Sequence, residues 1–327
     1  MRYTIESRFQ GAFLGAAVGE MLSNFYTDRS WHQLGVGLNW WDLDIDEGQQ
    51  DQLLPGWGSQ AVSVCKSLIA HGRVEGVDNE ATATILPVAL FFHEDAAKLR
   101  LRLNQLAVSS KETRDESLAI GYCLLQIAQE KLDPSAIVPQ IIAYIQGVSR
   151  DAHPVGGRSR SADGPKNRTR ADGAIASSLA QVQTLLEMRA SLETTSYMLS
   201  NSIGLALYCF LSTPEDFRLS VMRALRIARV QPQLVAALTG AMSGAYNSLA
   251  GIPVSWRIAI KRPLTAEKFL IPCWGVTSAA EIVQLATNLF VAWSGALLPT
   301  HLSNKSPQRY AVAAPQVMRP QSIGPDK

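Results

Sequence analysis

The chain has 327 residues, of which 47% are hydrophobic and 18% charged, with a net charge of +2. This length suits one large domain or two ordinary ones. The low charged fraction predicts a large core and a limited charged surface. A net charge of +2 gives no broad positive field to neutralise phosphates, which argues against general nucleic-acid binding.

The first residues of the chain and its most apolar late segment argue against a secreted or membrane protein. The first ten residues, MRYTIESRFQ, lack the unbroken apolar core of a signal peptide. The most apolar late segment, residues 276–298, is interrupted by Glu281, Gln284 and Asn288. A membrane span needs about 20 predominantly apolar residues. We therefore expect a soluble cytoplasmic protein with no membrane partner.

The four cysteines, Cys65, Cys123, Cys209 and Cys273, lie far apart and include no CxxC pair. A zinc site is therefore not indicated. Each cysteine has apolar neighbours, which predicts reduced thiols in the core of a cytoplasmic protein.

Helical periodicity dominates in chain order, and no segment gives a convincing strand pattern. An acceptor at Thr213, proline at 214 and acids after it predict one helix start there. The periodicity therefore predicts an all-α fold. The expected helices cover residues 7–25, 59–71, 81–93, 116–130, 134–146, 174–188, 192–211, 214–230, 233–250 and 278–297.

Two of these helices carry small residues at every fourth position beside an apolar stripe. Each interior glycine costs a helix about 1 kcal/mol relative to alanine. Such stripes make sense where another backbone packs closely, so we expect the two faces to help close a tight central bundle. The small residues are Gly11, Gly15 and Gly19 in the first helix and Ala236, Gly240 and Gly244 in the second.

Two segments lack any apolar period. Residues 149–173 are rich in glycine, serine and arginine, and we interpret them as a flexible basic surface loop that is either solvated or holds an acidic partner or phosphates. Residues 303–327 are polar and contain prolines, which predicts a disordered tail. The helices before and after the loop both contain many small residues. We therefore expect a single helical domain over residues 1–302.

Three stretches carry a resemblance to a known family. Residues 8–20, RFQGAFLGAAVGE, resemble the opening helix of the ADP-ribosylglycohydrolase family. Residues 237–246, ALTGAMSGAY, with GIP at 251–253 and then Trp256, resemble its late core helix and the exit from it. TPEDF at 213–217 resembles the helix that precedes the family's second metal motif. The resemblance implies a compact orthogonal multi-helix bundle of the ADP-ribosylglycohydrolase type.

Active members of that family use two magnesium ions, held by carboxylates and threonines, to remove ADP-ribose from modified side chains. Counted back from the late helix, the second motif, Asp-x-Asp-Thr, falls on Gln231, Gln233 and Leu234. The first, Thr-Asp-Asp-Thr, falls within residues 55–59, PGWGS. Glu20 stands where the family commonly has aspartate. Because neutral groups cannot offset the lost hydration of two divalent ions, we expect no metal site, no cofactor and no catalytic residue.

The resemblance without the motifs predicts a catalytically inactive pseudoenzyme that acts as a binding or regulatory protein. Its partner would be another protein, or an ADP-ribose-like ligand held in the vestigial cleft. An adenine ring can stack on tryptophans there. The tryptophans can equally form a protein contact surface or simply cover the open end of the bundle. The predicted ligand-binding residues are Trp40, Trp41, Trp57, Ser59, Gln231 and Gln233.

The alternative is an active ADP-ribosyl hydrolase with a rearranged carboxylate site. Glu20, Asp28 and the carboxylates of residues 42–46 would then hold the metal. Residues 42–48, DLDIDEG, superficially resemble a calcium loop, but glycine is not at the sixth position and glutamate is not at the twelfth, as an EF-hand requires. None of the five histidines has another at metal-ligand spacing. Trp57 filling the cleft would oppose this alternative.

Overall fold

The computed structural model describes residues 3–26, 57–74, 81–106, 110–151 and 174–296. Within these residues every regular element is a helix, which confirms the predicted all-α class. The helices are α1 (Ile5–Tyr26), α2 (Trp57–His71), α3 (Ala81–Phe91), α4 (Ala96–Leu106), α5 (Lys111–Ala128), α6 (Ile137–Asp151), α8 (Ala174–Glu187), α9 (Leu192–Met198), α10 (Ser202–Leu211), α11 (Phe217–Ile227), α12 (Pro232–Gly251), α13 (Val254–Ala259), α14 (Pro263–Thr265), the π-helix η2 (Ala266–Trp274) and α15 (Ala279–Ser294).

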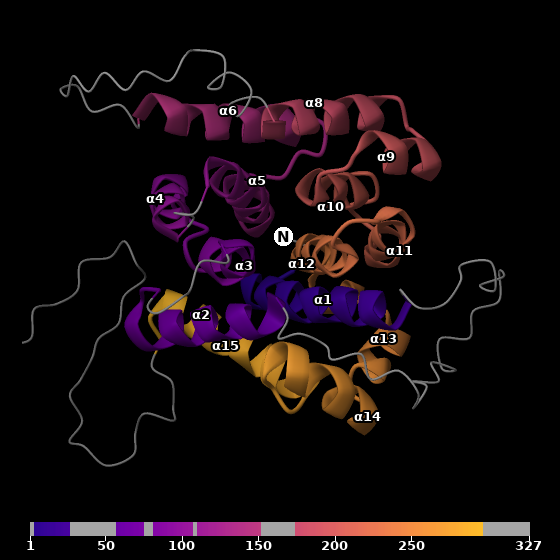
Figure 1. The fold of residues 1–327 in the computed structure, drawn as a ribbon. Coiled ribbons are helices and arrows are strands. Elements are labelled where there is room, and N and C mark those ends of the chain that lie inside the picture. The colour runs from indigo at the N-terminus through magenta and orange to yellow at the C-terminus, as the bar shows by residue number, and fades with distance from the viewer. Residues whose placement is uncertain (1–2, 27–56, 75–80, 107–109, 152–173, 297–327) are drawn as a thin grey trace, which may run out of the picture.

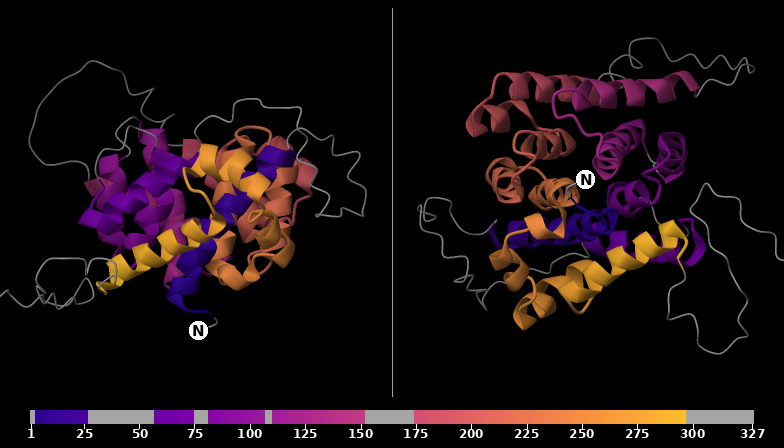
Figure 2. Two further views of the ribbon diagram at one scale, coloured as in Figure 1. Left: turned by 90° about the horizontal axis from the view of Figure 1, so that it is seen from below. Right: turned by 180° about the vertical axis from the view of Figure 1, so that it is seen from behind.

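The helices run in two main directions. Figure 1 shows α6 and α8 lying along one side of the molecule and α2 and α15 along the opposite side. Between them α3, α4, α5, α10 and α11 are seen nearly end-on, and the view from behind in Figure 2 shows the same layers. The helices of the middle therefore cross those of the two sides at steep angles, as expected for an orthogonal bundle.

The centre of the bundle is the antiparallel pair α1 and α12. A Cβ on Gly15 would overlap the carbonyl oxygen of Gly240, and one on Gly240 would overlap that of Gly15. One turn to either side, Gly11 meets Gly244 and Gly19 meets Ala236 in the same way. Each glycine removes the side chain that would hold the backbones apart. This confirms that the two small-residue faces pack against each other.

A buried arginine holds the end of this pair. The Arg8 side chain in α1 is 7% exposed and lies 2.9 Å from Glu130 Oε1. Its guanidinium also donates to the carbonyl oxygens of Ile127, Ala245 and Tyr246, near the C-terminal ends of α5 and α12. A buried charge is stable only when it is paired and hydrogen-bonded. Arg8 therefore ties three helices together where carbonyl groups would lack donors.

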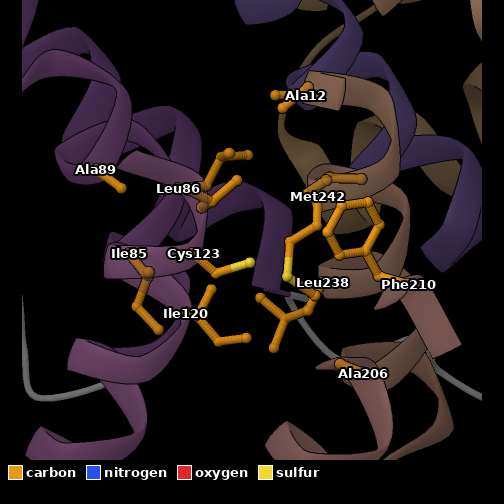
Figure 3. Close-up of a cluster of buried hydrophobic side chains, with 14 of the residues drawn as sticks. Ala12, Ile85, Leu86, Ala89, Ile120, Cys123, Ala206, Phe210, Leu238 and Met242 are labelled. Atoms are coloured by element: carbon orange, nitrogen blue, oxygen red, sulfur yellow. The ribbon is translucent and has the colours of Figure 1, made fainter. Parts of the chain in front are cut away.

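The core between α3, α5, α10 and α12 is made of aliphatic, aromatic and sulfur side chains, shown in Figure 3. Cys123 of α5 points into this core opposite Met242 of α12. All four cysteines are buried and unpaired, which confirms the predicted core thiols. Burial raises the pKa of the Cys123 thiol, because no charge nearby compensates for the lost hydration of a thiolate.

The structure corrects several predicted helix boundaries. The helix expected over residues 192–211 is two helices, because the Asn201 side chain caps a new start by accepting from Gly204 N at 2.9 Å. Residues up to Asp151, assigned to the basic loop, still belong to α6. Four elements were missed: α4, α13, α14 and η2.

The predicted start of α11 at Thr213 is also wrong. Asp216 is the N-cap, and its carboxylate accepts from Leu219 N at 2.9 Å. The Thr213 hydroxyl is used elsewhere, 3.1 Å from the Ser220 hydroxyl. Thr213 and Pro214 therefore belong to the turn between α10 and α11.

Replacing Asp216 by alanine should lower the free energy of unfolding by about 1 kcal/mol, because the first turn of α11 loses its side-chain acceptor. Asp216→Asn keeps an acceptor and should retain most of the stability. Urea denaturation of the two variants measures the difference. Equal losses in both variants would show that the cap contributes nothing.

No single helix among the described residues is long and apolar enough to cross a membrane, although the bent pair Pro263–Trp274 and Ala279–Ser294 together meets the length and composition limits. The remainder of the predicted basic loop, from residue 152, and the predicted tail lie outside the described residues. The single-domain boundary at residue 302 stays a prediction.

Candidate functional site: a carboxyl group closed off by tryptophan

The carboxyl group of Glu20 is buried near the C-terminal end of α1, with only 3% of the residue exposed. Burial raises its pKa from 4.5 to about 7, and the hydrogen bond from Trp274 opposes part of that rise. An ionised carboxylate loses most of its hydration in such a place, so the neutral form is favoured. Glu20 therefore keeps its proton to a higher pH than an exposed glutamate does.

The indole of Trp274 closes the space beside Glu20. Its Nε1 donates to Glu20 Oε2 at 2.8 Å, and the side chain is fully buried. Trp274 ends the π-helix η2, which stops at Gly275 in the left-handed conformation with φ 64°. A hydrogen bond from an indole to a carboxyl group serves either protonation state, because the carbonyl oxygen accepts in both.

The first turn of α2 packs against the other side of this indole. Gly58 contacts it so closely that a Cβ would overlap the ring of Trp274. The Trp57 ring meets Trp274 edge-on, with the centroids 5.9 Å apart. Trp57 Nε1 donates to the Thr82 carbonyl oxygen of α3 at 3.1 Å, which fixes the ring. Trp57, Gly58, Trp274 and Glu20 thus form one packed group, which we call the tryptophan plug.

The start of α12 lies at the same end of the central pair, because Ala236 meets Gly19, the neighbour of Glu20. Gln231 precedes the helix in the left-handed conformation, with φ 48°. Its side-chain oxygen accepts from the Ser202 hydroxyl of α10 at 3.1 Å. Leu234 packs against the core, and Gln233 is half-buried. The side-chain oxygen of Gln231 is therefore bonded to the protein itself, although the residue is exposed.

The donors that the described residues supply at this end of the bundle do not by themselves fit a dinuclear magnesium site. Magnesium requires hard oxygen ligands, chiefly carboxylates. At this end of the central pair the described residues supply one carboxyl group, that of Glu20. It already accepts from an indole N–H and has a raised pKa. The indole of Trp274 lies against it, and the start of α12 carries a neutral amide, Gln231, and an apolar side chain, Leu234. Among the described residues no group of three or more His, Cys, Asp or Glu side chains is placed to hold a metal ion.

The structure places the predicted ligand-binding residues in two groups. Trp57 and half-buried Ser59 lie together in the first turn of α2, and Gln231 and Gln233 lie at the start of α12. The other two, Trp40 and Trp41, lie outside the described residues, as do Asp28 and residues 42–46 of the alternative carboxylate site. Trp274 was not predicted as a site residue, because its segment has no helical pattern.

His93 has a structural position. It is 5% exposed, its Nδ1 lies 2.7 Å from the Leu90 carbonyl oxygen, and its ring meets Phe9 edge-on. Burial lowers its pKa, because the charged imidazolium would lose hydration. A neutral, fully packed imidazole at the end of α3 is consistent with a core role.

The comparison with protein families decides the relationship. The family model described as ADP-ribosylglycohydrolase matches residues 38–295, most of the chain. The chain belongs to the ADP-ribosylglycohydrolase family. The match includes Trp57, Gly58, Trp274 and Gln231, whereas Glu20 lies before it.

Two further comparisons complete this result. A solved structure titled "ADP-ribosylglycohydrolase-related protein complex" is 16% identical, with a TM-score of 0.48, and covers 88% of this chain and 98% of its own. No curated protein matches the sequence. The family assignment rests on the family model and not on that structure.

Proposed function

We propose that this ADP-ribosylglycohydrolase-family protein is a catalytically inactive member that acts as a binding or regulatory protein. The observation that carries the proposal is the Trp274 indole, which is bonded to Glu20 and packed against Trp57 and Gly58. The resemblance puts the first metal motif at the start of α2, against which this ring packs, so we infer that the ring takes space that a hydrolytic water and two metal ions would need.

The energetics of the site support the same proposal. Two divalent ions bring four positive charges, and several anionic ligands must offset the hydration that the ions lose. A neutral Gln231 amide engaged by Ser202 and a Glu20 carboxyl with a pKa of about 7 provide little of that charge. The close α1–α12 packing is intact, so we infer that the protein binds a partner without carrying out chemistry.

A hydrolysis assay tests the proposal. The full chain is incubated with ADP-ribosylated protein and Mg²⁺ or Mn²⁺, beside an active family member as positive control. We expect no ADP-ribose release above that of a reaction without the protein. Release that a chelator abolishes would instead support the rearranged carboxylate site, which includes Asp28 and residues 42–46.

A further inference from the structure

A groove at the other end of α10 from Gln231 is a second place where a ligand can bind. Ser202, in the first turn of α10, bonds Gln231, whereas Leu211 and Ser212, at the end of α10, line the groove. Its volume is about 740 Å³. Pockets for small molecules measure about 300–1,000 Å³. The groove therefore has the size of a nucleotide site and is separate from the tryptophan plug.

Two arginines line this groove, Arg189 after α8 and Arg223 on α11. Within the described part of the chain, neither guanidinium has a hydrogen bond or an ion pair. The carboxylate of Glu187, also at the groove, accepts from Gln183 at 2.6 Å. The apolar part of the wall includes Leu186. The groove thus combines two guanidinium groups with apolar surface.

The backbone at Arg189 is a second, independent observation. Arg189 has φ 48°, the left-handed conformation that glycine adopts without strain and arginine does not. Ala190 N donates to the Leu185 carbonyl oxygen at 3.0 Å, which makes Arg189 the left-handed residue of a Schellman motif, where glycine is usual. Strained non-glycine residues cluster at functional sites.

A comparable position shows what such a residue can do. Glu130 follows α5 in the same conformation, with φ 59°, and Lys131 N donates to the Gln126 carbonyl oxygen. The Glu130 side chain bonds buried Arg8, so its strain is offset by an interaction inside the protein. Arg189 has no such interaction among the described residues, and it faces the groove.

We propose that the groove between α8, α10 and α11 binds a phosphate-bearing small molecule of about nucleotide size through Arg189 and Arg223. A phosphate group offers three strong acceptor oxygens and so can bond two guanidinium groups at once. The apolar wall at Leu186 and Leu211 would pack against the uncharged body of the ligand. The proposal goes beyond the function proposed above, because it does not depend on what the tryptophan plug does.

Calorimetric titration of the full chain with adenosine monophosphate, ribose 5-phosphate and adenosine tests this site. We expect saturable binding of adenosine monophosphate that is at least about tenfold tighter than binding of adenosine. Ribose 5-phosphate should bind between the two and weaken as salt is raised. Equal binding of adenosine and its monophosphate, or no binding of any of the three, would overturn the proposal. So would binding of a glutamate-rich peptide in their place.

Arg189→Gly separates a ligand role from a structural one. Glycine suits the left-handed position, so the unfolding midpoint of this variant should equal or exceed that of the wild type. Its affinity for adenosine monophosphate should nevertheless fall by about tenfold or more, as should that of Arg223→Gln. Arg226→Ala, on the exposed side of α11, is the control and should bind like the wild type. Wild-type affinity in Arg189→Gly would refute the site.

Discussion

Replacing Gly240 by alanine is expected to lower the free energy of unfolding by about 3 kcal/mol or more. The new Cβ would overlap the Gly15 carbonyl oxygen and carbon, which are backbone atoms that no side-chain rotation can move away. The whole of α1 must therefore shift from α12, and the contacts of the flanking pairs, Gly11 with Gly244 and Gly19 with Ala236, would loosen with it. Chemical denaturation followed by circular dichroism measures the loss.

Gly147→Ala is the matched control, because Gly147 is also an interior glycine of a helix, α6. The nearest atoms to a Cβ there would be those of the Arg100 guanidinium, the end of a flexible side chain, at 3.2 Å. Alanine favours a helix by about 0.5–1 kcal/mol over glycine, so this variant should be as stable as the wild type or more stable. If Gly240→Ala behaved like Gly147→Ala, the close α1–α12 contact would be wrong.

Glu20→Gln is expected to change how stability depends on pH. The ordinary pKa of the glutamate is 4.5, and folding raises it to about 7. Between these values the folded state binds more protons than the unfolded state, so wild-type stability falls as pH rises and is flat above the window. Glutamine keeps an acceptor for Trp274 but does not titrate. The free energy of unfolding of the variant, relative to that of the wild type, should therefore rise by about 3 kcal/mol between pH 4.5 and pH 7.

Urea denaturation of both proteins across this pH window measures the difference. Glu281→Gln is the control, because hydrogen bonds from Thr277 lower the pKa of the exposed Glu281 carboxyl. A lowered pKa stabilises the folded state at pH values above the ordinary pKa, and this stability is lost as pH falls. As pH rises, the free energy of unfolding of this variant should therefore drop relative to that of the wild type. Parallel pH profiles for Glu20→Gln and the wild type would mean that Glu20 is not desolvated in the folded protein.

The central pair was predictable because its signal is local and repeated. Three small residues at intervals of four define one helix face, and a second helix repeats the pattern, so close packing needed no knowledge of the fold between them. Gly15 and Gly240 meet as that pattern indicates. The residue types at Gln231 and Gln233 also led to the expectation that the second metal motif is not retained, which stays a prediction.

The tryptophan plug could not be predicted in the same way. Trp274 and Glu20 are 254 positions apart, and nothing in either segment identifies the other. Trp274 lies in a π-helix that contains Pro272, and such a helix does not follow the period of 3.6 residues on which helix prediction depends. The prediction of the start of α11 was wrong for a different reason. Thr213 and Asp216 are both good caps by type, and the contact of Thr213 with Ser220 decides between them.

Calorimetric titration of the full chain with Mg²⁺ and Mn²⁺ tests the central claim most directly, that the family frame persists here without its metal chemistry. The titration includes every carboxylate of the chain, both Glu20 and those of residues 42–46. We expect no saturable heat that corresponds to two ions per chain in the micromolar range. Two such ions bound per chain, and lost in Glu20→Gln, would contradict the claim and restore a metal-dependent hydrolase.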